Sequence, residues 1–399
     1  QSLVTQTFAA TAANTYLTYD RAYSPFFSNT DSLIIETSVN GGSTYSTLVS
    51  LWGNENTGAP LNTVGRINDF SPTSGGQWRP TIFALPVGTN RIKFRARSGF
   101  GNNLYLDNIC LQVLPTAVTN TIGIASQGMW IPVAPYWRLA DTVRVYLHRT
   151  DFPNVVVDSS ISFPNSNAIV SPLFNKALNG SYYKVIRHRN SIETWSNTGL
   201  AYIRGSNTHF NFITPDGQAF ANNQAIVSTS PFYRGMYSGD VGRSGSYGVQ
   251  DSVVDGSDLS FIDNDAVNFV TGYVITDLTG DNATDGADLA VCENSAAEFA
   301  IRIAPAGGEP DVTPEQPKSL TEADRMKIEE GNRIQRERDL KNPPVDSKKF
   351  SYEEYLRSRH GNLLKNNPNV RLKENVIEKI QKNNSNTDNR VNGKLAGEL

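Results

Sequence analysis

The chain has 399 residues, of which 36 are Lys or Arg and 39 are Asp or Glu, giving a formal net charge of −3. This balance is not the signature of a nucleic-acid-binding protein, and no run of about 18 apolar residues is present to span a membrane. The length allows two to four domains. With 31 Gly, 20 Pro, 16 Tyr and 18 Phe, the composition favours short strands and turns, so we predict a mainly β chain.

Residues 1–114 alternate apolar and polar residues in short runs. In the run 91–97, for example, Ile92, Phe94 and Ala96 share one face while basic residues occupy the other. Three further runs bounded by Gly or Asn lie at residues 16–20, 32–38 and 103–109. We therefore predict an antiparallel β-sandwich.

Five strings in this segment form a set: YDRAY (19–23), DSL (31–33), NGGST (40–44), Trp78 and GNNLYLDNI (101–109). The set resembles the MAM-type jelly-roll modules of large bacterial surface and secreted proteins, many of them exported by the type IX route. The resemblance implies a jelly roll, and such modules usually carry more sequence before the first of these strings. We therefore expect either a further upstream strand or a partner at an edge left unpaired.

The same resemblance implies a structural calcium ion in this module. An aspartate of the last strand, Asp107 here, would hold the ion together with an acidic residue such as Asp20 or Asp31. The alternative is that Asp107 and Asn108 cap the end of a strand.

Residues 115–237 predict a second, Ig-like β-sandwich. Runs with a period of two are separated by clusters of Pro, Asn and Gly, and they lie at residues 143–148, 155–158, 182–188 and 209–213. Trp195 and His188 are candidates for a surface that binds carbohydrate or peptide. The alternative is that both side chains belong to a packed strand edge and loop.

Residues 238–305 contain an internal repeat of acidic residues. DSVVDGSDL (251–259) recurs thirty residues later as DNATDGADL (281–289), and the match extends to Phe269 and Phe299. In the second copy, oxygen-bearing groups fall at the positions that bind calcium in an EF-hand loop. These groups are Asp277, Thr279, Asp281, the carbonyl of Ala283, Asp285 and Asp288.

The first copy offers a similar set with one interruption. Its candidate ligands are Asp240, Asp251, the carbonyl of Val253, Asp255 and Asp258. Asp240 lies 18 residues before Asp258, whereas 11 residues separate Asp277 from Asp288, so about seven residues, 242–248, are inserted. We therefore expect the second loop to be the better site. The alternative for both copies is a pair of Asx turns without metal.

Two departures from the EF-hand pattern point to a family. Asn282 stands where the loop usually has Gly, and Asp288 stands where it has Glu. Both are found in dockerin-like repeats, which this segment resembles, and the block 183–196 resembles the sandwich domain that precedes such repeats. The resemblance implies Ca²⁺ as the ligand and a small α-helical module. We expect the core of that module to contain Leu259, Phe269, Leu289 and Phe299.

Residues 306–399 differ in composition from the rest of the chain. Residues 318–399 hold 18 of the 36 Lys and Arg against 13 Asp and Glu, so this tail carries +5 and the remainder −8. Capping-box patterns begin at Ser319 and Ser351, and apolar residues share a face near 370–382, which predicts short helices. Their apolar surface is too small to fold alone. The sandwich domain that usually ends type IX proteins is not evident, so we expect this extended or helical tail to contact other proteins of an assembly.

No catalytic constellation is evident. The histidines His148, His188, His209 and His360 share no metal-ligand spacing, and neither a Gly-x-Ser-x-Gly motif nor a P-loop occurs. The cysteines Cys110 and Cys292 predict two small buried side chains rather than a disulfide.

These patterns together predict a non-catalytic, calcium-stabilised structural or adhesion protein. Calcium loops of moderate affinity work where calcium is abundant, which favours an extracellular or bacterial cell-surface location, associated with the outer membrane. The first alternative is the accessory region of a secreted hydrolase, which binds polysaccharide or another substrate. The second is docking of a cohesin-type partner by the repeat itself, which needs exposed recognition side chains.

Overall fold

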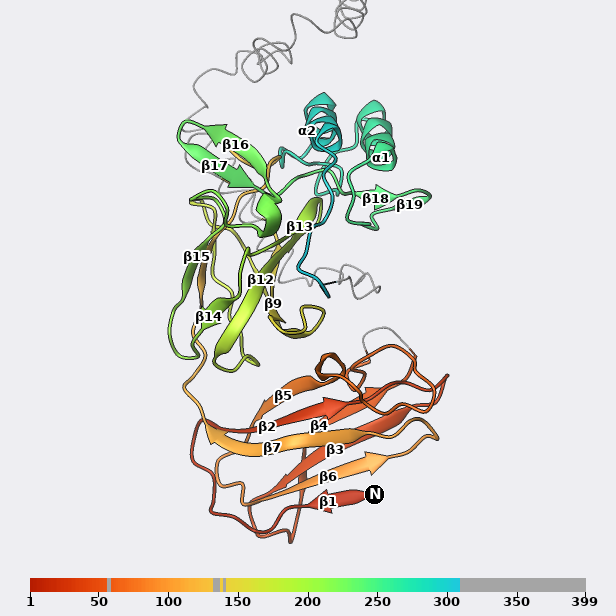
Figure 1. Cartoon of the computed structure of the whole chain (residues 1–399), viewed down its shortest axis with the longest axis vertical. Coiled ribbons are helices and arrows are strands. Elements are labelled where there is room, and N and C mark those ends of the chain that lie inside the picture. Colours follow the sequence, from red (N-terminus) through yellow and green to blue (C-terminus); the bar gives the residue numbers. More distant parts are fainter. Residues whose placement is uncertain (56–58, 132–136, 139–140, 309–399) are drawn as a thin grey trace, which may run out of the picture. The chain divides into compact units, whose positions relative to one another are not determined.

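The computed structural model describes residues 1–55, 59–131, 137–138 and 141–308. In this part the chain is mainly β, with two β-sandwiches followed by a small module that has two α-helices, which confirms the predicted fold class (Figure 1). None of the helices in these described residues is long and apolar enough to cross a membrane. The predicted helices of the tail lie outside the described residues, so they and the docking role of residues 318–399 stay predictions.

The first sandwich consists of a four-stranded and a three-stranded antiparallel sheet. The larger has the order β1 (Ser2–Val4), β6 (Arg91–Arg97), β3 (Asp31–Ser38) and β4 (Ser46–Gly53). The smaller has the order β5 (Arg79–Ala84), β2 (Thr15–Ala22) and β7 (Tyr105–Val113), and a 3₁₀ turn (Gly75–Gln77) precedes β5. Ile92 and Phe94 are buried in the core between the sheets, as the alternation predicts.

The second sandwich has a five-stranded and a three-stranded sheet. The larger comprises β10 (Val156–Ser162), β9 (Val143–Arg149), β12 (Gly180–His188), β13 (Ser191–Trp195) and β14 (Leu200–Tyr202). The smaller comprises β11 (Ile169–Val170), β8 (Thr121–Gly123) and β15 (His209–Asn211). A 3₁₀ turn (Phe220–Asn222) and the hairpin of β16 (Ala225–Thr229) and β17 (Phe232–Gly235) follow. Val145, Leu147 and Ile186 are fully buried in its core.

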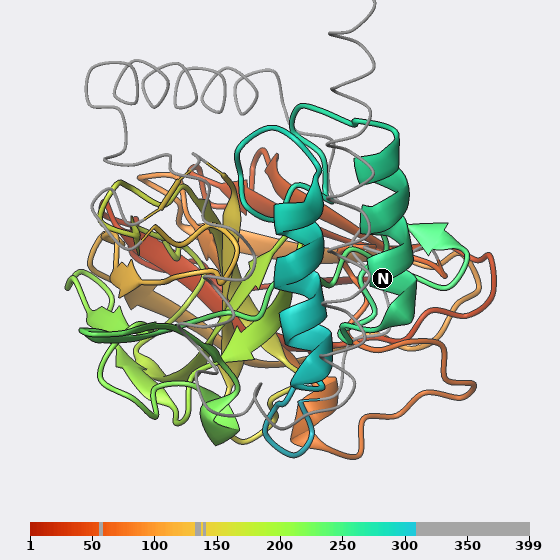
Figure 2. The same cartoon turned by 90° about the horizontal axis from the view of Figure 1, so that it is seen from above.

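The small module is built from the repeat. Its helices α1 (Gly256–Val267) and α2 (Gly286–Ala297) lie side by side (Figures 1 and 2). A hairpin of β18 (Gly242–Arg243) and β19 (Ser246–Tyr247) precedes α1. Each helix begins with a capping box, formed by Asp255 with Asp258 and by Asp285 with Asp288. The module's small core includes the fully buried Ile262 and Cys292.

Two predictions about buried side chains are wrong in part. Phe269 and Phe299 were expected in the core of the small module, but each is 85% exposed. Each follows its helix in the left-handed backbone region (φ 53° and 52°) and lies beyond a core that other side chains fill. Cys110 is exposed because it lies on the face of the edge strand β7 that points away from the core, whereas Cys292 is buried as expected. Leu259 and Leu289 pack against the module's core, as predicted.

Candidate functional site

The first aspartate of each acidic loop accepts hydrogen bonds from the turn that follows it. In the second loop, the Asp277 carboxylate accepts from the amides of Gly280 (2.7 Å), Asp281 (3.2 Å) and Asn282 (3.1 Å). In the first loop, the Asp240 carboxylate accepts from the amides of Asp251 (3.1 Å) and Ser252 (3.1 Å). Asp240 therefore has the same place in its loop as Asp277, although the inserted residues separate it from the rest of the copy.

The last aspartate of each loop connects the start of the loop to its helix. Asp288 accepts from the amides of Leu278 (2.7 Å), Thr279 (2.8 Å) and Asp285 (2.9 Å). Asp258 accepts from the amides of Val241 (2.8 Å), Gly242 (3.0 Å) and Asp255 (2.9 Å). The two loops thus share one hydrogen-bond frame, and Gly242 corresponds to Thr279.

The sharp turn of each loop uses a residue with positive φ. Asn282 has φ 69°, and Ser252, its counterpart in the first loop, has φ 71°. An EF-hand loop usually has Gly here because Gly adopts this conformation without steric cost. Asn is among the side chains that tolerate it best. The substitution noted in the sequence is therefore compatible with the loop's backbone.

Because Gly242 takes the place of Thr279, the insertion comprises residues 243–249 rather than the expected 242–248, and it forms most of the hairpin β18–β19. The hairpin begins at Gly242, which has no side-chain oxygen to offer where the second loop has Thr279. A Cβ atom at Gly242 would lie 2.7 Å from Cε2 of Phe261, so a larger residue would displace that ring. The first loop therefore has one candidate ligand fewer than the second.

Several loop carboxylates are buried close to one another. Burial raises the pKa of Asp258 and of Asp288 to about 6. It also raises the pKa of Asp277, and burial followed by the charge of Asp258 raises that of Asp240. By contrast, hydrogen bonds from Ser257 lower the pKa of Asp255. The raised pKa values reflect burial, which disfavours the ionised form of these carboxylates, and a neighbouring cation would favour that form.

The second loop contains a buried polar atom with no partner. Thr279 is 8% exposed, and its Oγ1 makes no hydrogen bond. Among the described residues, no group of three or more His, Cys, Asp or Glu side chains is already arranged to hold a metal ion. Asp281, for instance, pairs with Arg138 at 3.5 Å and accepts from the amide of Ala283 at 3.1 Å. The donors offered are all oxygens, the type that Ca²⁺ prefers, and an ion would give Thr279 a partner, so the residues of the second loop fit this ion.

The second loop is joined to the second sandwich through the two residues that follow β12. Arg189 donates to the carbonyls of Val274 and Asp277, the latter at 3.0 Å. Asn190 donates from Nδ2 to the carbonyls of Ile275 (3.2 Å) and Asp277 (3.1 Å). The backbone of the first loop residue is thus held by side chains of the sandwich.

A buried carboxylate holds Arg189 in place. Asp141 is fully buried and accepts from Arg189 Nε (2.8 Å), His188 Nε2 (3.1 Å) and the hydroxyl of Tyr273. Burial acts to raise the pKa of Asp141, but the charges of Arg189 and His188 outweigh it and hold that pKa below its usual range. We call the group Asp141, Arg189 and Asn190 the loop anchor. No spacing in the sequence predicted it, because it joins residues that are up to 136 positions apart, from Asp141 to Asp277.

The predicted surface site at Trp195 and His188 is wrong. Their exposed fractions are 1% and 3%. Trp195 packs against His148, with ring centroids 4.5 Å apart, and donates to Glu193. His188 donates to the buried Asp141, which also accepts from the hydroxyl of Tyr273 in the small module. The alternative interpretation, in which both side chains pack at a strand edge, agrees with the burial of Trp195 and His188.

The structure does not bring Asp20, Asp31 and Asp107 together. Asp20 and Asp107 are paired on β2 and β7, where Asn108 donates to both carboxylates at 2.7 Å. Asp31 begins β3 in the other sheet. Its carboxylate accepts from the hydroxyl of Tyr23 (2.7 Å) and the amides of Gly99 (2.6 Å) and Gly101 (3.2 Å). The strand-end alternative is wrong as well, because Asp107 and Asn108 lie within β7 at a shift in its register with β2.

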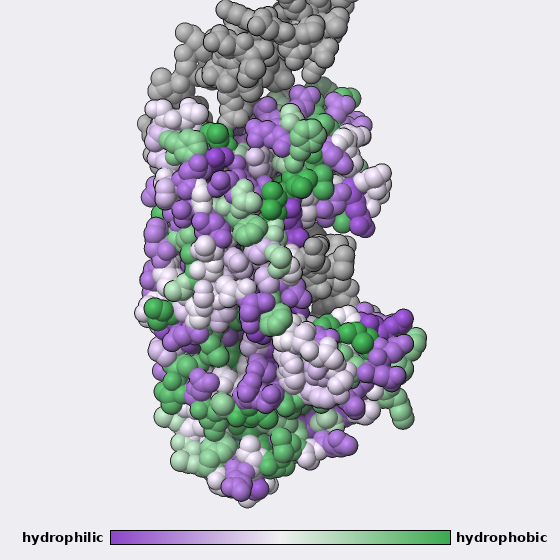
Figure 3. All heavy atoms as spheres, in the orientation of Figure 1, coloured by the Kyte–Doolittle hydropathy of each residue, from purple (hydrophilic) through white to green (hydrophobic). Residues whose placement is uncertain are grey.

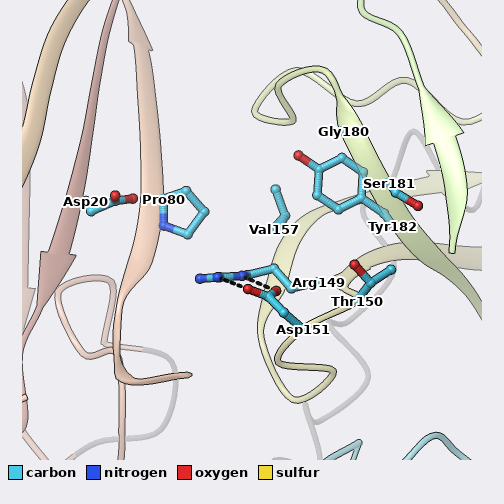
Figure 4. Close-up of a pocket in the computed structure, with 9 residues that line it drawn as sticks. All are labelled: Asp20, Pro80, Arg149, Thr150, Asp151, Val157, Gly180, Ser181 and Tyr182. Carbon is cyan, nitrogen blue, oxygen red and sulfur yellow. Dashed lines mark hydrogen bonds and ion pairs between the residues drawn. The ribbon is translucent and has the colours of Figure 1, made fainter. Parts of the chain in front are cut away.

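Figure 4 shows a polar pocket lined partly by the second sandwich. Its two charged residues from that sandwich, Arg149 and Asp151, pair with each other, with Nε 2.9 Å from Oδ1. A hydrogen bond from Arg149 lowers the pKa of Asp151, which keeps this carboxylate ionised. This pair therefore has the features of a surface ion pair rather than of a general acid or base.

No protein-family model and no curated protein sequence matches the chain. Among solved structures, the chain is similar to two mutant type II cohesin–X-dockerin complexes from Acetivibrio cellulolyticus. The match to the N-terminal interface mutant has 16% identity, a TM-score of 0.28 and coverage of 46% of this chain and 97% of that chain. The match to the C-terminal interface mutant has 14% identity, a TM-score of 0.30 and coverage of 47% and 97%. Similarity at these scores establishes neither a partner nor a function.

Proposed function

We propose that the chain is a non-catalytic, calcium-stabilised component of an extracellular or cell-surface protein assembly. In this proposal the two loops of the small module bind Ca²⁺, with the second loop as the tighter site. The ligands of the second loop would be Asp277, Thr279, Asp281, the carbonyl of Ala283, Asp285 and Asp288. Those of the first would be Asp240, Asp251, the carbonyl of Val253, Asp255 and Asp258. When bound, the ion supplies positive charge that orders the loops, and it takes no part in a reaction.

The observation that carries this proposal is the buried, unpartnered Oγ1 of Thr279 in a loop of buried carboxylates. An Asx turn without metal gives no reason for a hydroxyl to be buried unsatisfied, since such a group costs about 1–3 kcal/mol. The same hydrogen-bond frame in both loops supports two sites of one type rather than one accidental cluster.

Thermal unfolding of the full chain in excess CaCl₂ and in excess chelator tests the proposal. At a calcium concentration about 100 times the dissociation constant, one site stabilises the folded state by about 2.7 kcal/mol. We therefore expect the chelator to lower the unfolding midpoint by about 5–10 °C. MgCl₂ serves as the control, because Mg²⁺ demands a tighter octahedral site and should restore less of the midpoint. An unchanged midpoint in chelator contradicts the proposal.

A second candidate function is docking of a partner protein by the repeat itself. The exposure of Phe269 and Phe299, each 85%, favours it. Large apolar side chains at equivalent positions after both helices are costly on a free surface and are typical of a contact area.

Replacing both phenylalanines with Ser tests this docking. Capture of partner proteins from the source organism's secreted fraction should fall at least about tenfold, while the unfolding midpoint in calcium stays unchanged. A matched variant, Val39→Ser, changes an apolar residue in the first sandwich that is 60% exposed and should not affect capture. Equal capture by all three chains would exclude docking at these residues.

The role of residues 318–399 is part of the assembly proposal. Their net positive charge favours contact with an acidic protein surface. A chain ending at residue 310 should recover fewer partners than the full chain, and equal recovery would remove this role. The hydrolase-accessory alternative places polysaccharide or protein substrate on the first sandwich, so the burial of Trp195 and His188 in the second sandwich does not bear on it.

A further inference from the structure

The strand β7 forms an open edge of the first sandwich. It pairs with β2 on one side, and among the described residues no strand pairs with its other side. On the opposite sheet, the neighbouring edge is β1, which is only three residues long. A cavity of about 500 Å³ opens between these edges, lined by Leu3, Phe94, Leu104 and Leu106 among others. No strand of the described part of the chain therefore covers the sandwich along this side.

Core-facing side chains of β7 are consequently exposed. Leu111 pairs with the fully buried Leu17 and shares its face, and side chains two residues apart lie on the same side of a strand. Yet Leu111 is 41% exposed, Ile109 is 38% exposed and Val113 is 73% exposed. In Figure 3 apolar side chains gather low on the visible face, over β7. These residues face the core but lack a covering strand.

From Ile109 to Val113 the edge carries none of the usual protection against pairing. Exposed edge strands are commonly blocked by Lys, Pro or inward-pointing charges. β7 is nine residues long, contains neither Lys nor Pro, and has one charged residue, Asp107. The positive φ of Asn108 (52°) interrupts the ladder, so the uncharged stretch from Ile109 to Val113 is the part available to a partner strand.

We propose that this edge binds the same edge of a second copy of the chain. The stretch has apolar residues at its first, third and fifth positions, so it matches itself in an antiparallel pair centred on Leu111. Leu111 then faces Leu111 of the partner subunit, and Ile109 faces the partner's Val113. Such a two-fold contact covers the exposed apolar side chains of both copies, brings no like charges together and pairs the uncharged stretch of both β7 edges. A six-stranded sheet would then run across the dimer.

The register of the two β7 strands in the proposed dimer can be tested with a cross-strand disulfide. In this pairing Gln112 lies opposite Cys110 of the second copy, at the spacing a disulfide needs. We expect Gln112→Cys in the full chain to form a covalent dimer on mild oxidation. The control is the same change combined with Cys110→Ser, because the introduced thiols of two copies lie diagonally, about 7–8 Å apart, and do not pair. Dimers that form equally in both variants, or in neither, would overturn the proposed pairing.

A second measurement does not depend on oxidation. Sedimentation equilibrium of the full chain should show a dimer whose dissociation constant rises at least about tenfold in Leu111→Lys, because two ammonium groups would meet on the axis. Val87→Lys adds the same charge at a site of the first sandwich that is 68% exposed and should leave the dimer unchanged. Circular dichroism would verify that both variants fold. A monomer at all concentrations, or a dimer unaffected by Leu111→Lys, would overturn the proposal.

Discussion

The two acidic loops have the same hydrogen-bond frame but differ in ligands and in attachment. Asp258 and Asp288 each accept three backbone amides from equivalent positions, and each helix starts with the same capping box. At the third position, however, one loop has Gly242 and the other Thr279. The comparison teaches that a repeat can preserve the backbone of a loop while the side chains that offer oxygen atoms diverge.

The attachment of the loops differs as well. The carbonyl of Asp277 accepts from Arg189 and Asn190 of the second sandwich. The carbonyl of Asp240 instead accepts from Gln250, at 2.9 Å, which lies beside the insertion in the same loop. The second loop is therefore held by a side chain of the sandwich that belongs to a buried ion pair. The first loop is held by a neutral amide of its own, which also donates to the sandwich carbonyls of His188 and Ser191, both at 3.2 Å.

The largest expected difference between the loops is the loss of unfolding free energy when the side chain that holds each loop is removed. Arg189→Ala removes the charged guanidinium from the buried Asp141 and leaves it with His188 and Tyr273, so we expect the free energy of unfolding to fall by about 3 kcal/mol. Gln250→Ala removes neutral hydrogen bonds and should cost about 1 kcal/mol. Urea unfolding of both full-chain variants in calcium measures the two losses. Equal losses of unfolding free energy would show that Arg189 stabilises the fold no more than the side-chain amide of Gln250.

The second-largest expected effect is the loss of calcium affinity when the first aspartate of either loop is replaced. Asp277→Asn should weaken the tighter calcium site by about 100-fold, while Asp240→Asn should weaken the other site and leave the tighter one intact. Calorimetric titration of the metal-free variants distinguishes the sites by their affinities. If Asp240→Asn abolished the tighter site, the assignment of the loops would be reversed.

The hydroxyl of Thr279 should account for much of the remaining difference. Thr279→Val keeps the shape but removes the oxygen, so we expect calcium affinity at the second loop to fall about tenfold, towards that of the first. Thr279→Ser keeps the oxygen and should stay within about twofold of the parent chain. The same titration measures both variants, and an unaffected Thr279→Val variant would exclude this residue as a ligand.

Deleting the inserted hairpin should have the smallest effect on calcium affinity. Deleting residues 243–249 would give the first loop the length of the second while keeping Gly242 and Gln250. The contact between Tyr247 and Phe261, with ring centroids 5.4 Å apart, would be lost, at a cost of about 1 kcal/mol. We expect calcium affinity at the first loop to change by less than about threefold, as the hairpin contributes no ligand. A tenfold gain would mean that the insertion itself weakens the site.

Much of this organisation follows from local sequence patterns. Period-two runs locate β2, β3, β6, β9 and β12, because alternation directly reflects which side chains enter the core. The acidic repeat locates both loops, and its spacing reveals the insertion before the hairpin is seen. These features depend on neighbours within a few residues, which a sequence displays.

Features that depend on distant contacts were not predictable in this way. Trp195 and His188 have the residue types of a binding surface, but their burial is decided by packing against His148 and by contact with Asp141. Likewise, Phe269 and Phe299 continue the repeat and suggest a core, although the module is too small to bury them. In each case the environment is set by which elements meet in space.

The most direct test of the central claim is a calcium titration of the metal-free full chain by isothermal calorimetry. We predict two binding events, and the tighter one should disappear in Asp277→Asn, leaving the weaker. Absence of any calcium binding, or binding that is unchanged when Asp277 and Asp240 are both replaced with Asn, would contradict the claim that these loops are calcium sites.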